Sequence, residues 1–144
     1  MKLYHYTTGH KLPQIQLENR IRPSRDGILW LSSNPVYEYS ALKPVNGRLS
    51  LELLRSSVGL YRFHVEEEAA HPWATVRHEN HFGLNSVGRR MGANPLEWYC
   101  LFQGVPPKNL EYFNPWGKWV PETLEEAVKK FHSLGVNVES RYIA

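Results

Sequence analysis

The sequence predicts a single α+β domain over residues 1–144, and three observations lead to that class. Short segments rich in β-branched and aromatic residues recur along the chain, which is typical of strands. Shorter helical patterns lie between them, and one clear amphipathic helix follows near the C-terminal end. The chain has 144 residues, of which 42% are hydrophobic, which suits one domain with its own core.

Six segments are predicted strands, because each is rich in β-formers and bounded by Gly, Pro, Asn or Asp. They cover residues 3–7, 28–32, 59–65, 98–102, 110–113 and 136–143. Residues 59–65 alternate, with Tyr61, Phe63 and Val65 on one face. Residues 28–32 are apolar on both faces, so we expect this strand to lie inside the sheet.

Three segments are predicted helices. Residues 10–19 place Pro13 in the first turn, where its missing N–H does no harm. A second helix is expected to begin with Asn34 as N-cap and Pro35 as the first helical residue. Residues 121–135 form the amphipathic helix, with Gly135 capping its end. The second helix would carry Tyr37, Tyr39 and Leu42. Residues 43–48 are a predicted loop, and residues 66–94 are predicted to be helix fragments and loops.

Composition argues against several classes of protein. No run approaches the roughly 20 apolar residues of a membrane span, and the N-terminus lacks the apolar stretch of a signal peptide. We therefore expect a cytoplasmic protein. Cys100 is the only cysteine, so intramolecular disulfides and cysteine-based zinc sites are ruled out. The histidines between residues 71 and 81 lack His-Glu-x-x-His spacing, so no metal is expected.

Three segments place a polar or aromatic residue where a predicted strand begins or ends, which is where a sheet presents side chains to a cleft. They are Leu3–Thr8, Gly27–Ser32 followed by Tyr37 and Tyr39, and Leu96–Phe102. Neither a serine-hydrolase G-x-S-x-G elbow nor a phosphate-binding P-loop is present in the sequence.

In order and spacing, these segments resemble the ADP-ribosyltransferase superfamily, on its diphtheria-toxin and poly(ADP-ribose) polymerase side, whose signature is His–Tyr–Glu. The first family motif is an aromatic-His-x-Thr/Ser strand, then a helix and a G-x-I/L-x-P stretch. The second is a G-I-Y-F-A/S strand followed by a stacking tyrosine. The third is a glutamate that opens a strand, then a V-P-P-x-x-L/I exit. The similar segments here are Tyr4–Thr7 with Arg20–Pro23, Gly27–Ser32 with Tyr37 or Tyr39, and Glu97–Phe102 with Val105–Leu110.

The resemblance, which covers roughly residues 3–113, implies a split β-sandwich with short helices flanking a central NAD cleft. It implies an NAD-dependent mono-ADP-ribosyltransferase of the kind found in toxins and in phage or bacterial defence effectors, with NAD as substrate. Glu97 would be the catalytic carboxylate, stabilising the positive charge that builds on the ribose as nicotinamide leaves. The residues that would bind NAD are His5, Tyr6, Thr7, Trp30, Ser32, Tyr37 and Tyr39.

Arginines are candidates for the charged parts of the ligands. One of Arg20, Arg22 or Arg25 would meet the pyrophosphate, because the arginine fork fits phosphate oxygens. In the family, the loop before the catalytic glutamate recognises the acceptor. That loop would be residues 85–95 here, where Arg89 and Arg90 could contact a macromolecular acceptor, either nucleic acid or protein. The net charge of +3 is compatible with an anionic partner but does not specify one.

Several alternatives stay open. Water as acceptor would make the chain an NAD glycohydrolase. A third possibility is a degenerate member that binds NAD or ADP-ribose without turnover, because Tyr6 stands where the polymerases have glycine. An RNA 2′-phosphotransferase-like relative would rely on several basic residues, so Glu97 argues against it. An interaction domain that docks a partner through residues 121–134 ranks last, because the charged face of that helix looks solvated.

Overall fold

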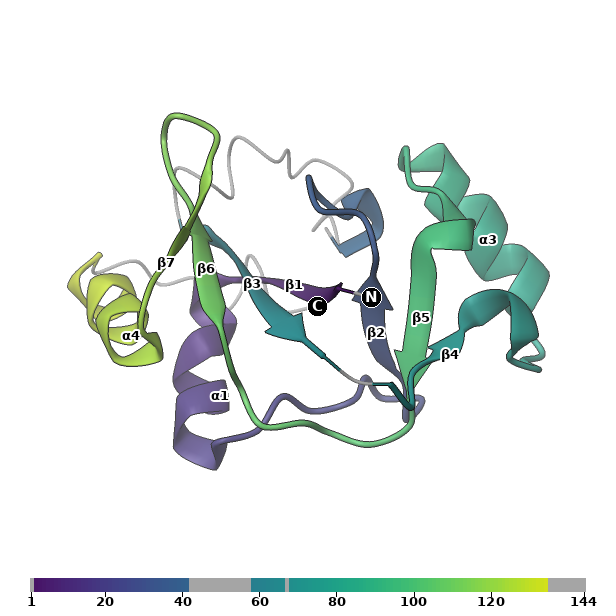
Figure 1. Cartoon of the computed structure of the whole chain (residues 1–144), viewed down its shortest axis with the longest axis horizontal. Coiled ribbons are helices and arrows are strands. Elements are labelled where there is room, and N and C mark those ends of the chain that lie inside the picture. The colour runs from purple at the N-terminus through teal and green to yellow at the C-terminus, as the bar shows by residue number, and fades with distance from the viewer. Residues whose placement is uncertain (1, 42–57, 67, 135–144) are drawn as a thin grey trace.

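The computed structural model describes residues 2–41, 58–66 and 68–134 (Figure 1). The predicted loop at 43–48, the strand at 136–143, and the positions of Leu42 and Gly135 lie outside these residues. The described chain is a mixed α+β structure with one antiparallel sheet and three α-helices.

Seven strands form the sheet in the order β4-β5-β2-β1-β3-β6-β7, and every neighbouring pair is antiparallel. Their bounds are β1 Leu3–Thr8, β2 Leu29–Ser32, β3 Leu60–Val65, β4 His71–Pro72, β5 Trp98–Leu101, β6 Leu110–Phe113 and β7 Trp119–Pro121. The five strands predicted within the described residues are confirmed, and β2 is internal as expected. The edge strands β4 and β7 were not predicted, because they are short and each contains a proline.

The two central strands meet at a single point. β1 pairs with β2 only at Tyr4 and Ser32, whereas it pairs with β3 at six positions. Figure 1 shows β1 running across the direction of β2. The sheet therefore consists of two halves, β4-β5-β2 and β1-β3-β6-β7, which diverge from this junction.

The helices cover the sheet in two places. α1 (Leu12–Glu18) and α4 (Leu124–Ser133) lie beside β3 and β6, and α3 (His81–Arg90) lies beside β5 (Figure 1). The first and last predicted helices are confirmed. α1 ends at Asn19 in the left-handed conformation, and α4 begins at the N-cap Thr123, whose Oγ1 accepts a hydrogen bond from the Glu126 N–H at 3.1 Å. None of the helices in the described part of the chain has the length and apolar character that crossing a bilayer requires.

One predicted helix and one predicted loop need correction. Residues 34–38 are not helical, and only a 3-10 helical turn at Tyr39–Ala41 follows. The Asn34 Oδ1 accepts from the N–H of Val36, but the chain then turns, and Glu38 is held by the Ser32 hydroxyl and the Trp98 indole N–H instead of continuing a helix. Residues 85–90, which were predicted to belong to an acceptor loop, are the second half of α3. Arg89 and Arg90 are therefore exposed residues at the end of a helix.

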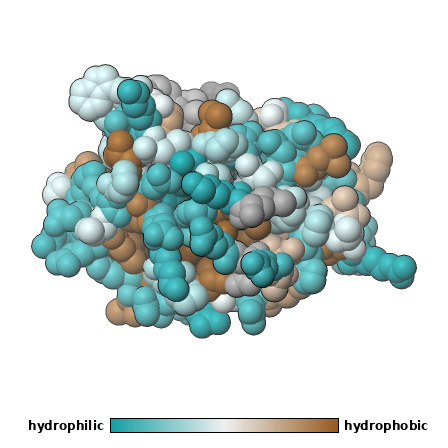
Figure 2. Space-filling view, in the orientation of Figure 1, coloured by the Kyte–Doolittle hydropathy of each residue, from teal (hydrophilic) through white to brown (hydrophobic). Residues whose placement is uncertain are grey.

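The core consists of three clusters. The largest packs α1 and α4 against the sheet and includes Leu12, Leu29 and Phe63. The second groups tyrosines on the other side of β1, and the third lies between α3 and β5 around Trp73 and Trp98. The molecular face in Figure 2 is largely hydrophilic, with apolar side chains showing in small scattered groups.

Candidate functional site

Glu97 lies where β5 begins, next to the end of β2. Ser32, the last residue of β2, pairs with Trp98, the first of β5, so Glu97 stands directly beside the segment that leaves β2. The backbone carbonyl of Glu97 accepts from the Ser33 N–H at 2.9 Å, and its Oε1 accepts from the Asn34 side-chain amide at 3.4 Å. The carboxylate is half-buried, which leaves part of it accessible to a ligand.

A second carboxylate, missed by the sequence reasoning, organises this region. Glu38 is only 7% exposed and accepts hydrogen bonds from the Ser32 hydroxyl at 2.8 Å and the Trp98 indole N–H at 3.1 Å. It also accepts from the backbone N–H of Ser40 at 3.2 Å and from the Ser40 hydroxyl. Glu38 thereby ties β2, β5 and the 3-10 turn together. Its place between Tyr37 and Tyr39 was the available signal in the sequence.

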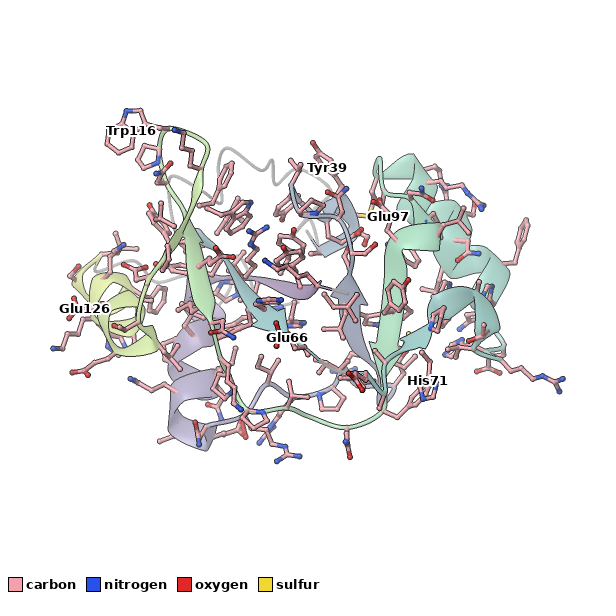
Figure 3. The ribbon with its side chains drawn as sticks, viewed as in Figure 1. Tyr39, Glu66, His71, Glu97, Trp116 and Glu126 are labelled. Carbon is pink, nitrogen blue, oxygen red and sulfur yellow. The ribbon has the colours of Figure 1, made fainter. Side chains whose placement is uncertain are left out.

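The two candidate stacking tyrosines differ in exposure. Tyr37 is buried, with its ring centroid 5.3 Å from that of Tyr6 and 5.5 Å from that of Tyr39. Tyr39 is 43% exposed, and its ring lies against Gly92, where an added Cβ would be 3.9 Å from the Tyr39 Cγ. Figure 3 shows Tyr39 and Glu97 at the same edge of the molecule. Of the two rings, Tyr39 is the one that is exposed to solvent.

The tyrosines beneath Tyr39 are neutral core groups. Burial raises the pKa of Tyr6 to about 12, against the opposing effect of Arg62, and burial also raises the pKa of Tyr37. The Tyr6 hydroxyl donates to the backbone carbonyl of Asn34. Tyr6 therefore connects β1 to the segment after β2 through its side chain.

Arg62 is a buried cation that the sequence reasoning did not place in the site. It lies on β3 and is 7% exposed. Its Nε donates to the Glu111 Oε1 at 2.7 Å, and its guanidinium contacts the Tyr6 hydroxyl at 3.4 Å and also donates to the carbonyl of Pro35. The guanidinium carbon lies 4.1 Å from the ring centroid of Tyr4. Arg62 thus links the second half of the sheet to the segment that leaves β2.

His5 stands at the junction of the two central strands. Its Nδ1 is 3.0 Å from the carbonyl oxygen of Trp30, and since a carbonyl only accepts, this nitrogen carries the proton. Burial lowers the pKa of His5, so the ring is neutral at pH 7. Strand alternation puts His5 and Thr7 on the opposite face of β1 from Tyr4 and Tyr6. The Thr7 hydroxyl is buried and has no hydrogen-bond partner among the described residues.

Other predicted residues lie apart from Glu97. The ring of Trp30 packs against Trp73 at 4.8 Å and Trp98 at 5.8 Å between centroids, so its contacts are those of a core residue. Arg20 donates to the Gly104 carbonyl at 3.2 Å, and Arg22 pairs with Glu18. These two arginines and Arg25 precede β2, whereas Ser32 ends it, so the strand separates them from Glu97.

The structure therefore brings together Tyr6, Ser32, Tyr37, Tyr39 and Glu97, with Glu38 and Arg62 as buried supports. His5 and Thr7 lie on the opposite face of β1 from Tyr6 and are not part of this group. Two surface pockets of about 320 and 580 Å³ lie elsewhere, and none of these residues lines them. Within the described residues, no three His, Cys, Asp or Glu side chains are arranged to hold a metal ion.

Comparison of the chain with protein-family models, with curated proteins and with solved structures finds no match. Function must therefore be inferred from the residues of this chain.

Proposed function

We propose that the chain is an NAD-dependent mono-ADP-ribosyltransferase, which transfers ADP-ribose from NAD⁺ to a macromolecule. The observation that carries the proposal is the position of Glu97. Glu97 is half-buried and stands directly before β5, toward the same side of the molecule as the exposed ring of Tyr39 in Figure 3. A carboxylate and an exposed aromatic face are the two kinds of group that suit a ribose carrying a cationic ring.

The proposed transfer of ADP-ribose needs few protein groups beyond a carboxylate and an aromatic ring. The bond between the ribose C1′ and the nicotinamide nitrogen breaks, and its electron pair leaves with nicotinamide, which becomes neutral. The ribose passes through an oxocarbenium-like state, which a nearby carboxylate stabilises. An oxygen or nitrogen of the acceptor then bonds to C1′ and releases its proton. Glu97 would accept a hydrogen bond from a ribose hydroxyl during these steps.

The divergence of the sheet supports the finer fold assignment as well. A split β-sandwich needs two sheet halves that separate around the ligand, and here β1 and β2 share only the pair Tyr4 and Ser32. Beyond that pair, the edge of β1 that faces β2 has no ladder partner among the residues that the structure describes. We propose that NAD lies along this divergence, with Glu97 on one half and the β1 backbone near Tyr6 on the other.

A second candidate, binding of NAD or ADP-ribose without turnover, is favoured by a different observation. The hydroxyl of Ser32 is committed to Glu38, and Tyr37 is buried beneath Tyr39. Two residues expected to touch the ligand are thus engaged within the protein. The same experiment separates the two candidates.

The test mixes the full chain with labelled NAD⁺ and with separate pools of DNA, RNA and protein. Label on one pool supports transfer, whereas free ADP-ribose alone would indicate a glycohydrolase. Glu97→Gln, which keeps the shape of the side chain, should lower nicotinamide release by roughly 100-fold or more. The matched control is Glu126→Gln, an exposed carboxylate on α4 that Figure 3 places far from Glu97.

Unchanged activity in Glu97→Gln would remove the catalytic role from this residue. Absence of turnover together with calorimetric binding of NAD⁺ would establish the second candidate instead. Absence of both turnover and binding would end the proposal.

A further inference from the structure

A separate pocket lies at the other end of β5 from Glu97. It has a volume of about 320 Å³, which is within the range of small-molecule sites of about 300–1,000 Å³. His71 of β4 lines it and pairs with Cys100 near the end of β5. Figure 3 shows His71 and Glu97 at opposite ends of this strand. Nothing in the proposed NAD chemistry uses this pocket.

One side of the pocket offers flat and apolar surface. Ile28 is buried and Val76 is half-buried. Phe102 is 55% exposed, and the ring centroid of His71 lies 5.5 Å from that of Phe102, with 34° between the planes. An exposed phenylalanine next to an imidazole gives a surface on which an aromatic ring can stack.

The polar side of the pocket carries an uncommitted positive charge. Arg77 is exposed and makes no hydrogen bond or ion pair with any described residue. Asp26 is the carboxylate among the described lining residues, and its two oxygens each have a neighbour. It accepts from the Ser24 hydroxyl, and the Nε2 of His78 lies 3.8 Å from its Oδ2. These contacts orient the Asp26 carboxylate without cancelling its charge. The cationic group of the pocket is the Arg77 guanidinium, whose geometry fits phosphate oxygens.

We propose that this pocket binds a phosphorylated nucleoside, with its base against Phe102 and His71 and its phosphate on Arg77. The pocket volume suits one such unit. A free nucleotide and a residue of a single-stranded nucleic acid present the same chemistry, because both join a flat base to a phosphate. The inference stands apart from the proposed function, since it uses neither Glu97 nor Tyr39.

The test follows backbone amide resonances of the full chain while adenosine monophosphate is added to millimolar concentrations. The amides of Ile28, Val76 and Phe102 should shift in a saturable way. Glu97→Gln should leave these shifts unchanged, so failure of the NAD proposal would not affect the result. Shifts confined to Asn34 and Tyr39 would place the nucleotide in the other site and overturn the inference.

Separate ligands and variants identify which groups bind. Adenosine and inorganic phosphate should each bind more weakly than the monophosphate, and a short oligoadenylate that binds more tightly would identify nucleic acid as the source. Arg77→Gln should raise the Kd of the monophosphate by roughly tenfold, with partial recovery in Arg77→Lys. Phe102→Leu should weaken binding of the monophosphate but not of phosphate.

Lys118→Gln removes one exposed cation from the β6–β7 turn and serves as the matched control for charge. Both Arg77 and Phe102 are exposed, so their variants should keep the fold, which thermal unfolding checks. A Kd that does not change in Arg77→Gln, or inorganic phosphate that binds as tightly as the monophosphate, would overturn the assignment.

Discussion

Replacing Gly88 by alanine should destabilise the protein through the indole of Trp98. A Cβ at position 88 would lie 2.3 Å from the Trp98 Cη2 and 2.5 Å from its Cζ2, far inside contact distance. Trp98 is buried and its Nε1 donates to Glu38, so it cannot move freely. Overpacking of this kind costs about 1–3 kcal/mol. A lost hydrogen bond to a buried carboxylate adds about 1–3 kcal/mol.

Alanine also favours a helix interior over glycine by about 1 kcal/mol, which offsets part of this cost. The expected net loss in Gly88→Ala is therefore about 3 kcal/mol in the free energy of unfolding. Denaturant unfolding monitored by tryptophan fluorescence measures it. Trp98 follows Glu97 directly in the chain and begins β5, so a shift of Trp98 would also move Glu97. We therefore expect the proposed release of nicotinamide to fall in this variant as well.

The same helix contains a matched control. Gly83 has no heavy atom within 4 Å of an added Cβ, so Gly83→Ala should only gain helix propensity. It should raise the free energy of unfolding by about 0.5–1 kcal/mol. Equal stability of the two alanine variants would refute the packing argument.

Three further predictions concern the junction, the buried cation and the last helix. Burial holds the pKa of His5 below 6.5, so the unfolded chain binds this proton before the folded chain does as the pH falls, and stability is lost below about pH 6.5. The drop in Tm between about pH 7 and pH 5 should therefore be smaller in His5→Asn than in the parent chain. Equal drops in the two proteins would contradict this role of His5. Arg62→Met should cost about 3 kcal/mol in urea unfolding, because it leaves the partly buried Glu111 carboxylate without its partner, and a change below about 1 kcal/mol would show the pair to be dispensable. Thr123→Ala should cost about 1 kcal/mol by removing the cap on the Glu126 N–H, and an unchanged denaturation midpoint would argue against the cap.

The strands were predictable because their signals are local. Residues 3–8 and 60–65 combine β-formers with clear boundaries, and tertiary packing agrees with them. The segment after Asn34 was mispredicted because its conformation depends on distant partners. Glu38 is held by Trp98, which is 60 residues away in sequence, and no local pattern reports such a contact.

The loop predicted at residues 85–95 came from the family resemblance, and residues 85–90 are helical instead. Gly88 lies inside α3, where a residue without a Cβ lets the helix approach Trp98. Glu97 and Tyr39, two residues predicted for the site, lie toward the same side of the molecule in Figure 3, and their roles stay predictions. Arg62 was not assigned to it, because an arginine in an alternating strand gives no sign of whether it is buried.

The single backbone pair between Tyr4 and Ser32 is the only ladder contact between β1 and β2 among the described residues, so the two halves of the sheet are joined at one point. Side-chain hydrogen bonds cross this junction, from Arg62 to the Pro35 carbonyl and from His5 to the Trp30 carbonyl. We expect these bonds to set the angle between the two halves of the sheet. A variant that loses one of these hydrogen bonds should change the angle between the two halves, while the strands of each half keep their own hydrogen bonds. Such variants would retain a native far-ultraviolet circular dichroism spectrum and lose the near-ultraviolet signal of their aromatic side chains.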